Sequence, residues 1–237
     1  MNKLIIILFL ILSFSSCQKK SKLKINESEF KGKTFNAYSS SEIDTLIIDF
    51  QDSTHQIFGG LWSGKIPWRI SHYDETNILV LDNRLIGIKI NPDNSLDCIS
   101  IGLTDKPFKM SERKPKWKKD YLYGTWIEEK FIETDSTDFP PPPRTQNLKI
   151  NWPPSYTITE KEIVFDYYKK SESKIQIPNS ADFIQMNLRH PLFNQTDYNW
   201  IIEYLSDDLM VVIKDFEVEQ LNNNTRDSEK IRLIKKR

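Results

Sequence analysis

The chain has 237 residues, and its charges balance, because 33 lysine and arginine residues oppose 33 aspartate and glutamate residues. This balance gives the protein no electrostatic reason to bind nucleic acid or an anionic membrane face. The 2 cysteines, Cys17 and Cys98, are too few for a disulfide-rich scaffold.

The first residues have the layout of an export signal. Lys3 supplies a positive charge, and Leu4–Leu12 is an apolar run shorter than the roughly 20 residues of a membrane-spanning helix. The small residues directly before Cys17 resemble the lipobox of bacterial lipoproteins, in which the cysteine is acylated and becomes the mature N-terminus. We therefore expect residues 1–16 to be a lipoprotein signal peptide and residues 17–28 to be the lipidated Cys17 and a tether. The alternative is an ordinary secreted protein.

This resemblance implies a location in the bacterial cell envelope, with the membrane as a partner through acylated Cys17. Two or more acyl chains give stable anchoring, whereas a single chain gives marginal binding. Gln18 and Lys19 follow Cys17 without the aspartate that retains enterobacterial lipoproteins in the inner membrane. An outer-membrane anchor facing the periplasm is expected, and surface exposure is the alternative.

The body of the chain is rich in strand signals. Short β-branched and aromatic runs alternate with turn clusters, which predicts an all-β protein built as an antiparallel meander. The runs are TLIIDF (45–50), HQIFGG (55–60), WRISHY (68–73), NILVL (77–81), RLIGIKI (84–90) and LDCISIG (96–102). Asp82-Asn83 predicts a compact hairpin and Asn91–Ser95 a longer turn, so that 84–90 pairs with 96–102. Cys98 is expected to be a buried small hydrophobe.

The second half of the chain repeats the plan of the first half. EFKGKTF (29–35) is similar to DYLYGTWI (120–127), and the closing segments FKMSER (108–113) and IRLIKKR (231–237) are also similar. We expect two tandem β units, over residues 29–113 and 120–237, joined by a linker at 114–119.

Two insertions enlarge the second unit. The tract Pro140–Pro143 must run as polyproline II, and it is either a stiff loop or a ligand for an aromatic groove. In the other insertion, a short helix is expected near Ser180–Asn187.

The segment Gly124-Thr125-Trp126, an antiparallel meander and a basic residue on the last strand resemble the lipocalin-like families, in particular lipoproteins of the Bacteroidetes type. The resemblance implies that Trp126 closes the base of a barrel or half-barrel, and that Arg232 or Lys235 covers its ring through a cation–π contact. In the first unit the equivalents are Phe35 and either Lys109 or Arg113. The family also implies an apolar interior for a small hydrophobic ligand, and a core filled by side chains is the alternative.

Motifs for catalysis or cofactors are not evident. Gly59, Gly64 and Lys65 have the spacing of a phosphate loop, but Ile66 and Pro67 replace the hydroxyl and the helix that such a loop needs, which favours a turn that exposes Trp62 and Trp68. His55, His72 and His190 lack metal-ligand spacing, and each is expected to be a surface or capping residue. We expect Asp207-Asp208 to form a hairpin turn and not an acid/base pair. We expect no enzyme, no metal and no cofactor.

Two functional hypotheses follow. In the first, the protein is a lipid-anchored, lipocalin-like binding protein for a small hydrophobic molecule. In the second, it is a scaffolding, envelope-assembly or toxin-immunity lipoprotein that binds another protein through the proline tract and the loop tryptophans Trp62, Trp68 and Trp152.

Overall fold

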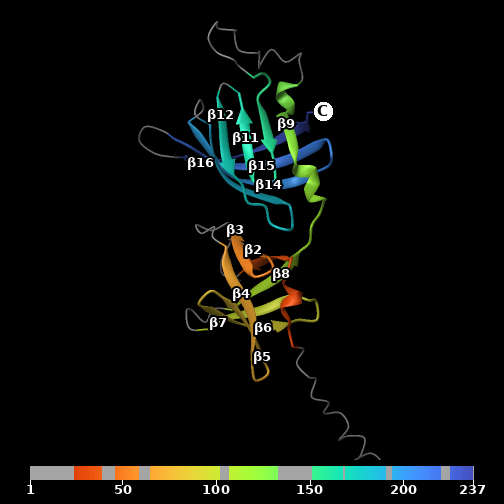
Figure 1. Ribbon diagram of the computed structural model, residues 1–237, viewed down its shortest axis with the longest axis vertical. Coiled ribbons are helices and arrows are strands. Elements are labelled where there is room, and N and C mark those ends of the chain that lie inside the picture. Colours follow the sequence, from red (N-terminus) through yellow and green to blue (C-terminus); the bar gives the residue numbers. More distant parts are fainter. Residues whose placement is uncertain are drawn as a thin grey trace, which may run out of the picture.

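The computed structural model describes residues 24–38, 46–58, 65–101, 107–132, 151–167, 169–190, 194–219 and 225–236. The predicted signal peptide, Cys17, Trp62 and the proline tract 140–143 lie outside the described residues. The described chain forms two eight-stranded antiparallel sheets in tandem, as the sequence predicts (Figure 1).

The first sheet is a closed barrel in which each strand pairs with the next and the first strand pairs with the last. Its strands are β1 (Thr34–Tyr38), β2 (Leu46–Phe50), β3 (Thr54–Phe58), β4 (Ile66–Tyr73), β5 (Thr76–Leu81), β6 (Arg84–Ile90), β7 (Leu96–Ile101) and β8 (Pro107–Arg113). A short 3-10 turn, η1 (Glu27–Glu29), precedes β1. Closure through the β1–β8 ladder removes both sheet edges, which would otherwise expose unpaired backbone groups.

The turn residues that the sequence singles out shape this barrel. Asp82 links β5 to β6 with φ 55°, and Asn94 lies between β6 and β7 with φ 64°. Both are residue types that tolerate the left-handed region. The predicted pairing of residues 84–90 with 96–102 is confirmed, from Leu85 opposite Ile101 to Ile90 opposite Leu96.

Aromatic side chains fill the first barrel. The Phe30 ring lies 5.0 Å from Phe50 and 5.2 Å from Phe35, and the Trp68 ring lies 5.1 Å from Phe50. Leu79, Cys98 and Met110 complete this core with no exposed surface. Edge-to-face ring pairs such as Phe50–Trp68 add to the free energy of apolar burial.

The second sheet has the order β12-β11-β10-β9-β16-β15-β14-β13. Its strands are β9 (Gly124–Glu128), β10 (Ser155–Ile158), β11 (Glu162–Asp166), β12 (Lys170–Lys174), β13 (Phe183–His190), β14 (Gln195–Leu205), β15 (Leu209–Val218) and β16 (Thr225–Lys235). The 3-10 turns η2 (Lys119–Leu122) and η3 (Glu129–Phe131) flank β9. An isolated bridge between Gln176 and Gln185 joins the two edge regions, so the sheet is nearly closed.

The helix expected near Ser180–Asn187 is wrong. Residues Phe183–His190 form β13, in which Ile184, Met186 and Leu188 are buried while the residues between them are more exposed. This alternation has the period of two residues that a strand with one buried face requires. Asp207-Asp208, by contrast, does form the predicted hairpin turn between β14 and β15.

The helical segments that the structure describes are single 3-10 turns, and none has the length or apolar character needed to span a membrane.

Candidate binding site: the cleft between the two units

The two units meet through a buried polar joint. Thr34 on β1 donates its hydroxyl to Asp49 Oδ1 at 2.7 Å, and the backbone amide of Asn179 donates to the same oxygen at 2.7 Å. The amide of Ser180 donates to Thr34 Oγ1 at 3.0 Å. Thr34 and Asp49 are each 1% exposed, so these bonds replace the hydration that the first barrel gives up at the joint.

An ion pair reinforces the joint. Arg113 Nε, at the end of β8, contacts both carboxylate oxygens of Asp182 at 2.8 and 2.9 Å, and Arg113 also donates to Asn36. Ser180 Oγ donates to Asp182 at 2.7 Å. The Asp182 side chain is almost fully buried, so its charge depends on these partners.

Apolar contacts and one indole complete the joint. Phe58 and Phe183 stack edge-to-face with ring centroids 5.9 Å apart, next to Ile47. The Trp117 indole donates to the carbonyl of Ala181 at 2.9 Å. Residues 179–183, which precede or begin β13, therefore hold the second unit against the end of the first barrel.

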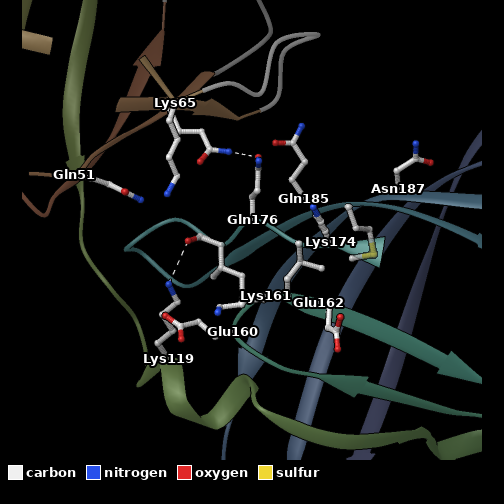
Figure 2. A pocket seen from close by; sticks show the side chains of 14 residues that line it. Gln51, Lys65, Lys119, Glu160, Lys161, Glu162, Lys174, Gln176, Gln185 and Asn187 are labelled. Atoms are coloured by element: carbon white, nitrogen blue, oxygen red, sulfur yellow. Dashed lines mark hydrogen bonds between the residues drawn. The ribbon is translucent and has the colours of Figure 1, made fainter. Parts of the chain in front are cut away.

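A cleft of about 820 Å³ opens beside this joint and is lined by both units (Figure 2). Its first-unit residues are Gln51, Gln56 and Lys65. Lys119 comes from the end of the linker, and the second-unit residues are Glu160, Lys161, Glu162, Lys174, Ile175, Gln176, Ile177, Gln185, Met186 and Asn187. Figure 2 shows Lys65 and Gln51 entering from the first unit, opposite Lys161 and Gln176 of the second.

The lining of the cleft is polar, with an excess of positive charge. Four lysines face two glutamates, and the amide side chains come from both units. Gln56 donates to Gln176 across the joint, and Lys119 Nζ donates to the carbonyl of Ile177 at 3.3 Å. Ile175 and Met186, which belong to the core of the second unit, supply the apolar part of the lining. Ammonium and amide groups arranged in this way suit a polar ligand with negative charge.

The structure brings together Gly124, Trp126 and Lys235, which the resemblance expects at the base of the second unit. Trp126 is fully buried, and Lys235 Nζ lies 5.0 Å from the centre of its ring. Lys235 also donates to the carbonyl of Tyr121 at 3.1 Å. Gly124 has φ +136°, and the Lys235 side chain passes over it. Of the two candidates for the cover, Lys235 therefore takes this role and Arg232 does not, since Arg232 is exposed and pairs with Glu129 at 2.6 Å.

The first unit does not reproduce this arrangement. Phe35 is buried within the aromatic core, but Arg113 turns to Asp182 at the joint. Lys109 lies on β8 with an exposed side chain. The first unit therefore shares with the second unit only a buried aromatic ring, Phe35 in place of Trp126, and lacks the basic side chain that covers it.

The tryptophans expected at the surface have different positions. Trp68 lies in β4 instead of a turn, is 7% exposed, and donates its indole N–H to the carbonyl of Gln51 at 3.0 Å. Its apolar ring completes the first core, so it is not available to a partner. Trp152 is partly buried between the rings of Phe131 and Tyr167, at 5.5 and 6.1 Å.

A buried charged network in the second unit was missed by the sequence reasoning. His190 Nε2 lies 3.2 Å and Lys214 Nζ 3.4 Å from Asp197 Oδ2, and the Trp200 indole donates to the same oxygen at 3.3 Å. Burial alone would raise the pKa of Asp197, but the hydrogen bond with His190 and the charge of Lys214 outweigh it and leave that pKa below its usual value. This network is enclosed, so it serves the interior of the unit.

The expected surface position is therefore wrong for His190, and it is also wrong for His55, which is 2% exposed. Burial lowers the pKa of His55 and favours its neutral form. His72 is exposed and bonds to Asn77. Cys98 is buried, as expected, and burial raises the pKa of its thiol to about 12, which keeps it protonated and unreactive. Within the described ranges, no group of three or more His, Cys, Asp or Glu side chains is placed to hold a metal ion.

The cleft itself could not be found from the sequence. Its lysines and amides are spread over residues 51–187 and share no local spacing. Only the folding of residues 179–183 against β1 and β2 brings them together.

No protein-family model matches this chain, and a search of curated proteins found no match. The two barrel-like antiparallel units fit a lipocalin-like fold that is compatible with ligand binding.

Proposed function

We propose that this protein is a non-catalytic binding lipoprotein of the bacterial envelope, anchored through Cys17, and that it binds a polar, negatively charged ligand in the cleft between its two units. The observation that supports this proposal is the cleft lining, in which four lysines and several amides converge from both units beside a buried joint.

A hydrophobic ligand inside one barrel is the expectation from the lipocalin resemblance. The described core of the first barrel is occupied by aromatic rings 5.0–6.0 Å apart. In the second unit, Trp126, Trp200 and Tyr156 occupy the interior. The cleft is therefore the better candidate for the ligand site, and its lining selects a polar ligand.

Native mass spectrometry tests the proposal on chain extracted gently from its own membranes. The wild type is expected to carry a bound species, which is lost from the double variant Lys161→Glu and Lys174→Glu because two of the four cleft charges are reversed. The matched control is Lys169→Glu and Lys170→Glu, which changes lysines near β12 that lie outside the lining. This control should keep the bound species.

The same spectra separate the parts of the proposal. A bare wild-type mass, or a bound species that survives the cleft variant, would overturn the cleft as the binding site. A second polypeptide lost with the cleft variant would identify the ligand as a partner protein. The chain mass reports acylation at Cys17 independently of either result.

A further inference from the structure

The outer surface of the first barrel carries apolar side chains where polar ones are expected. Leu85, Ile99 and Ile101 are 41%, 50% and 46% exposed. They lie on β6 and β7 on the face that points away from the core, where a solvated antiparallel sheet normally presents polar residues. Together with Ile78 on β5, we call them the β5–β7 outer face.

The strand register makes this face continuous. Leu85 lies directly opposite Ile101, and Gly87 lies between Ile78 and Ile99. An added Cβ at Gly87 would lie 3.9 Å from Ile101 Cδ1, so the Ile101 side chain already leans over the glycine. Contiguous exposed apolar surface of this kind marks a contact with a protein or a membrane.

Basic side chains surround the face. Arg69 lies opposite Val80 on the β4 side, and Lys89 and Lys109 flank Asp97 on the β8 side. Among the residues that directly flank the face in the strand register, these three basic side chains accompany one acidic side chain, Asp97. An apolar centre with a basic rim matches the boundary between acyl chains and anionic headgroups.

The place where the chain enters the barrel points to the same occupant. The Ile25 backbone amide donates to Asn77 Oδ1 at 3.0 Å, and Asn77 precedes Ile78 of the outer face. Cys17 is eight residues before Ile25 (25 − 17), which spans at most about 28 Å when extended. The second unit stands on the far side of the first barrel from this entry point (Figure 1).

We propose that the β5–β7 outer face rests on the bilayer to which Cys17 anchors the chain. This inference rests on the proposed lipid anchor. The tether keeps the face at a high effective concentration near the surface, so a small apolar patch with weak intrinsic affinity stays docked. The second unit and the cleft then project away from the membrane.

Spin labelling tests this orientation on the acylated full chain in vesicles of phosphatidylcholine and phosphatidylglycerol at three to one. A nitroxide is placed at Ile99→Cys, and the matched control is Ile201→Cys on β14, where the isoleucine is 42% exposed. Cys98 is fully buried and escapes labelling. Collisions with an aqueous nickel chelate should be severalfold fewer at position 99 than at 201, and collisions with oxygen should be more frequent.

Three results would overturn the inference, each for a different reason. Equal nickel accessibility at the two positions on vesicle-bound chain means that the face is in water although the anchor holds. If the chain does not sediment with the vesicles, the proposed lipid anchor at Cys17 is refuted as well. Spin–spin broadening at position 99 that grows with protein density identifies a second copy, instead of lipid, as the occupant.

Discussion

Both the backbone conformation and the space around Gly124 exclude other residue types. Its φ of +136° lies in a region that L side chains rarely adopt, and an added Cβ would stand 2.6 Å from Cε of Lys235. Lys235 takes this route because its ammonium group reaches the Trp126 ring and the Tyr121 carbonyl. The glycine is therefore part of the same closure as the tryptophan two residues later.

Replacing Gly124 with alanine is expected to destabilise the protein by about 1–3 kcal/mol, because the backbone is strained and the Lys235 cover is displaced. Chemical denaturation followed by tryptophan fluorescence measures this change. The matched control is Gly87→Ala, since its nearest contact would be an ordinary 3.8 Å and its φ is not positive. Equal losses in the two variants would refute the explanation.

At this scale the resemblance singles out Gly124 and Trp126 but leaves the cover open between Arg232 and Lys235. Strand alternation decides between them. Ile231 and Leu233 are buried, so odd-numbered positions of β16 face inward and Arg232 faces solvent. Lys235 shares the inward side with them, and the apolar alternation in IRLIK could have decided between the two candidates.

At the scale of elements, the Asp197 network joins five strands of the second sheet. Asp197 on β14 contacts His190 on β13 and Lys214 on β15, and Lys214 donates to Tyr156 on β10 at 3.4 Å. Tyr156 in turn donates to Glu128. A buried ion pair adds little net stability, but removing one partner leaves a costly unpaired charge.

The variant Asp197→Asn is expected to lose about 3 kcal/mol at neutral pH, because it removes the carboxylate partner of the buried Lys214 side chain. In the folded chain the pKa of Asp197 lies below the ordinary value of 3.8 for an aspartate. Its stabilising contribution is therefore present above that value and is lost as the pH falls through the folded pKa.

Free energies of unfolding measured between about pH 7 and pH 3 test whether the stabilising contribution of Asp197 decreases as the pH falls. The wild type should lose stability on acidification more steeply than Asp197→Asn. Asp52→Asn, at an 84% exposed side chain, should follow the wild-type profile. Parallel profiles for wild type and Asp197→Asn would contradict the role assigned to the network.

Sequence reasoning predicts the strands of the first unit well, because each is a short apolar run between turn residues. It fails to find the network because His190, Asp197 and Lys214 occupy three strands and meet only after pairing. It also assigns a helix to β13, although Ile184, Met186 and Leu188 alternate there with polar residues as a strand with one buried face requires.

At the scale of the whole molecule, residues 179–183 determine how the two units are placed. Asp182 is the centre of this joint, since it accepts from Arg113 of the first unit and from Ser180 of its own. The sequence predicts two tandem units but gives no sign that the insertion in the second contains the contact between them.

Asp182→Ala is expected to cost about 3 kcal/mol, because the Arg113 guanidinium loses its partner at a largely buried site. The units should also separate, which small-angle scattering would record as a larger radius of gyration. The control Arg189→Ala removes an exposed pair with Glu219 and should cost less than about 1 kcal/mol. An unchanged radius in Asp182→Ala would show that the other contacts suffice.

The β9–β16 ladder has a consequence for how the chain is made. The first barrel closes between β1 and β8, so its pairing is complete once residue 113 has been synthesised. The second sheet pairs its first strand with its last, through Leu233 opposite Glu128. Its pairing is therefore complete only after β16 has been synthesised. During synthesis, a closed first barrel therefore precedes a second sheet that still lacks the partner strand of β9.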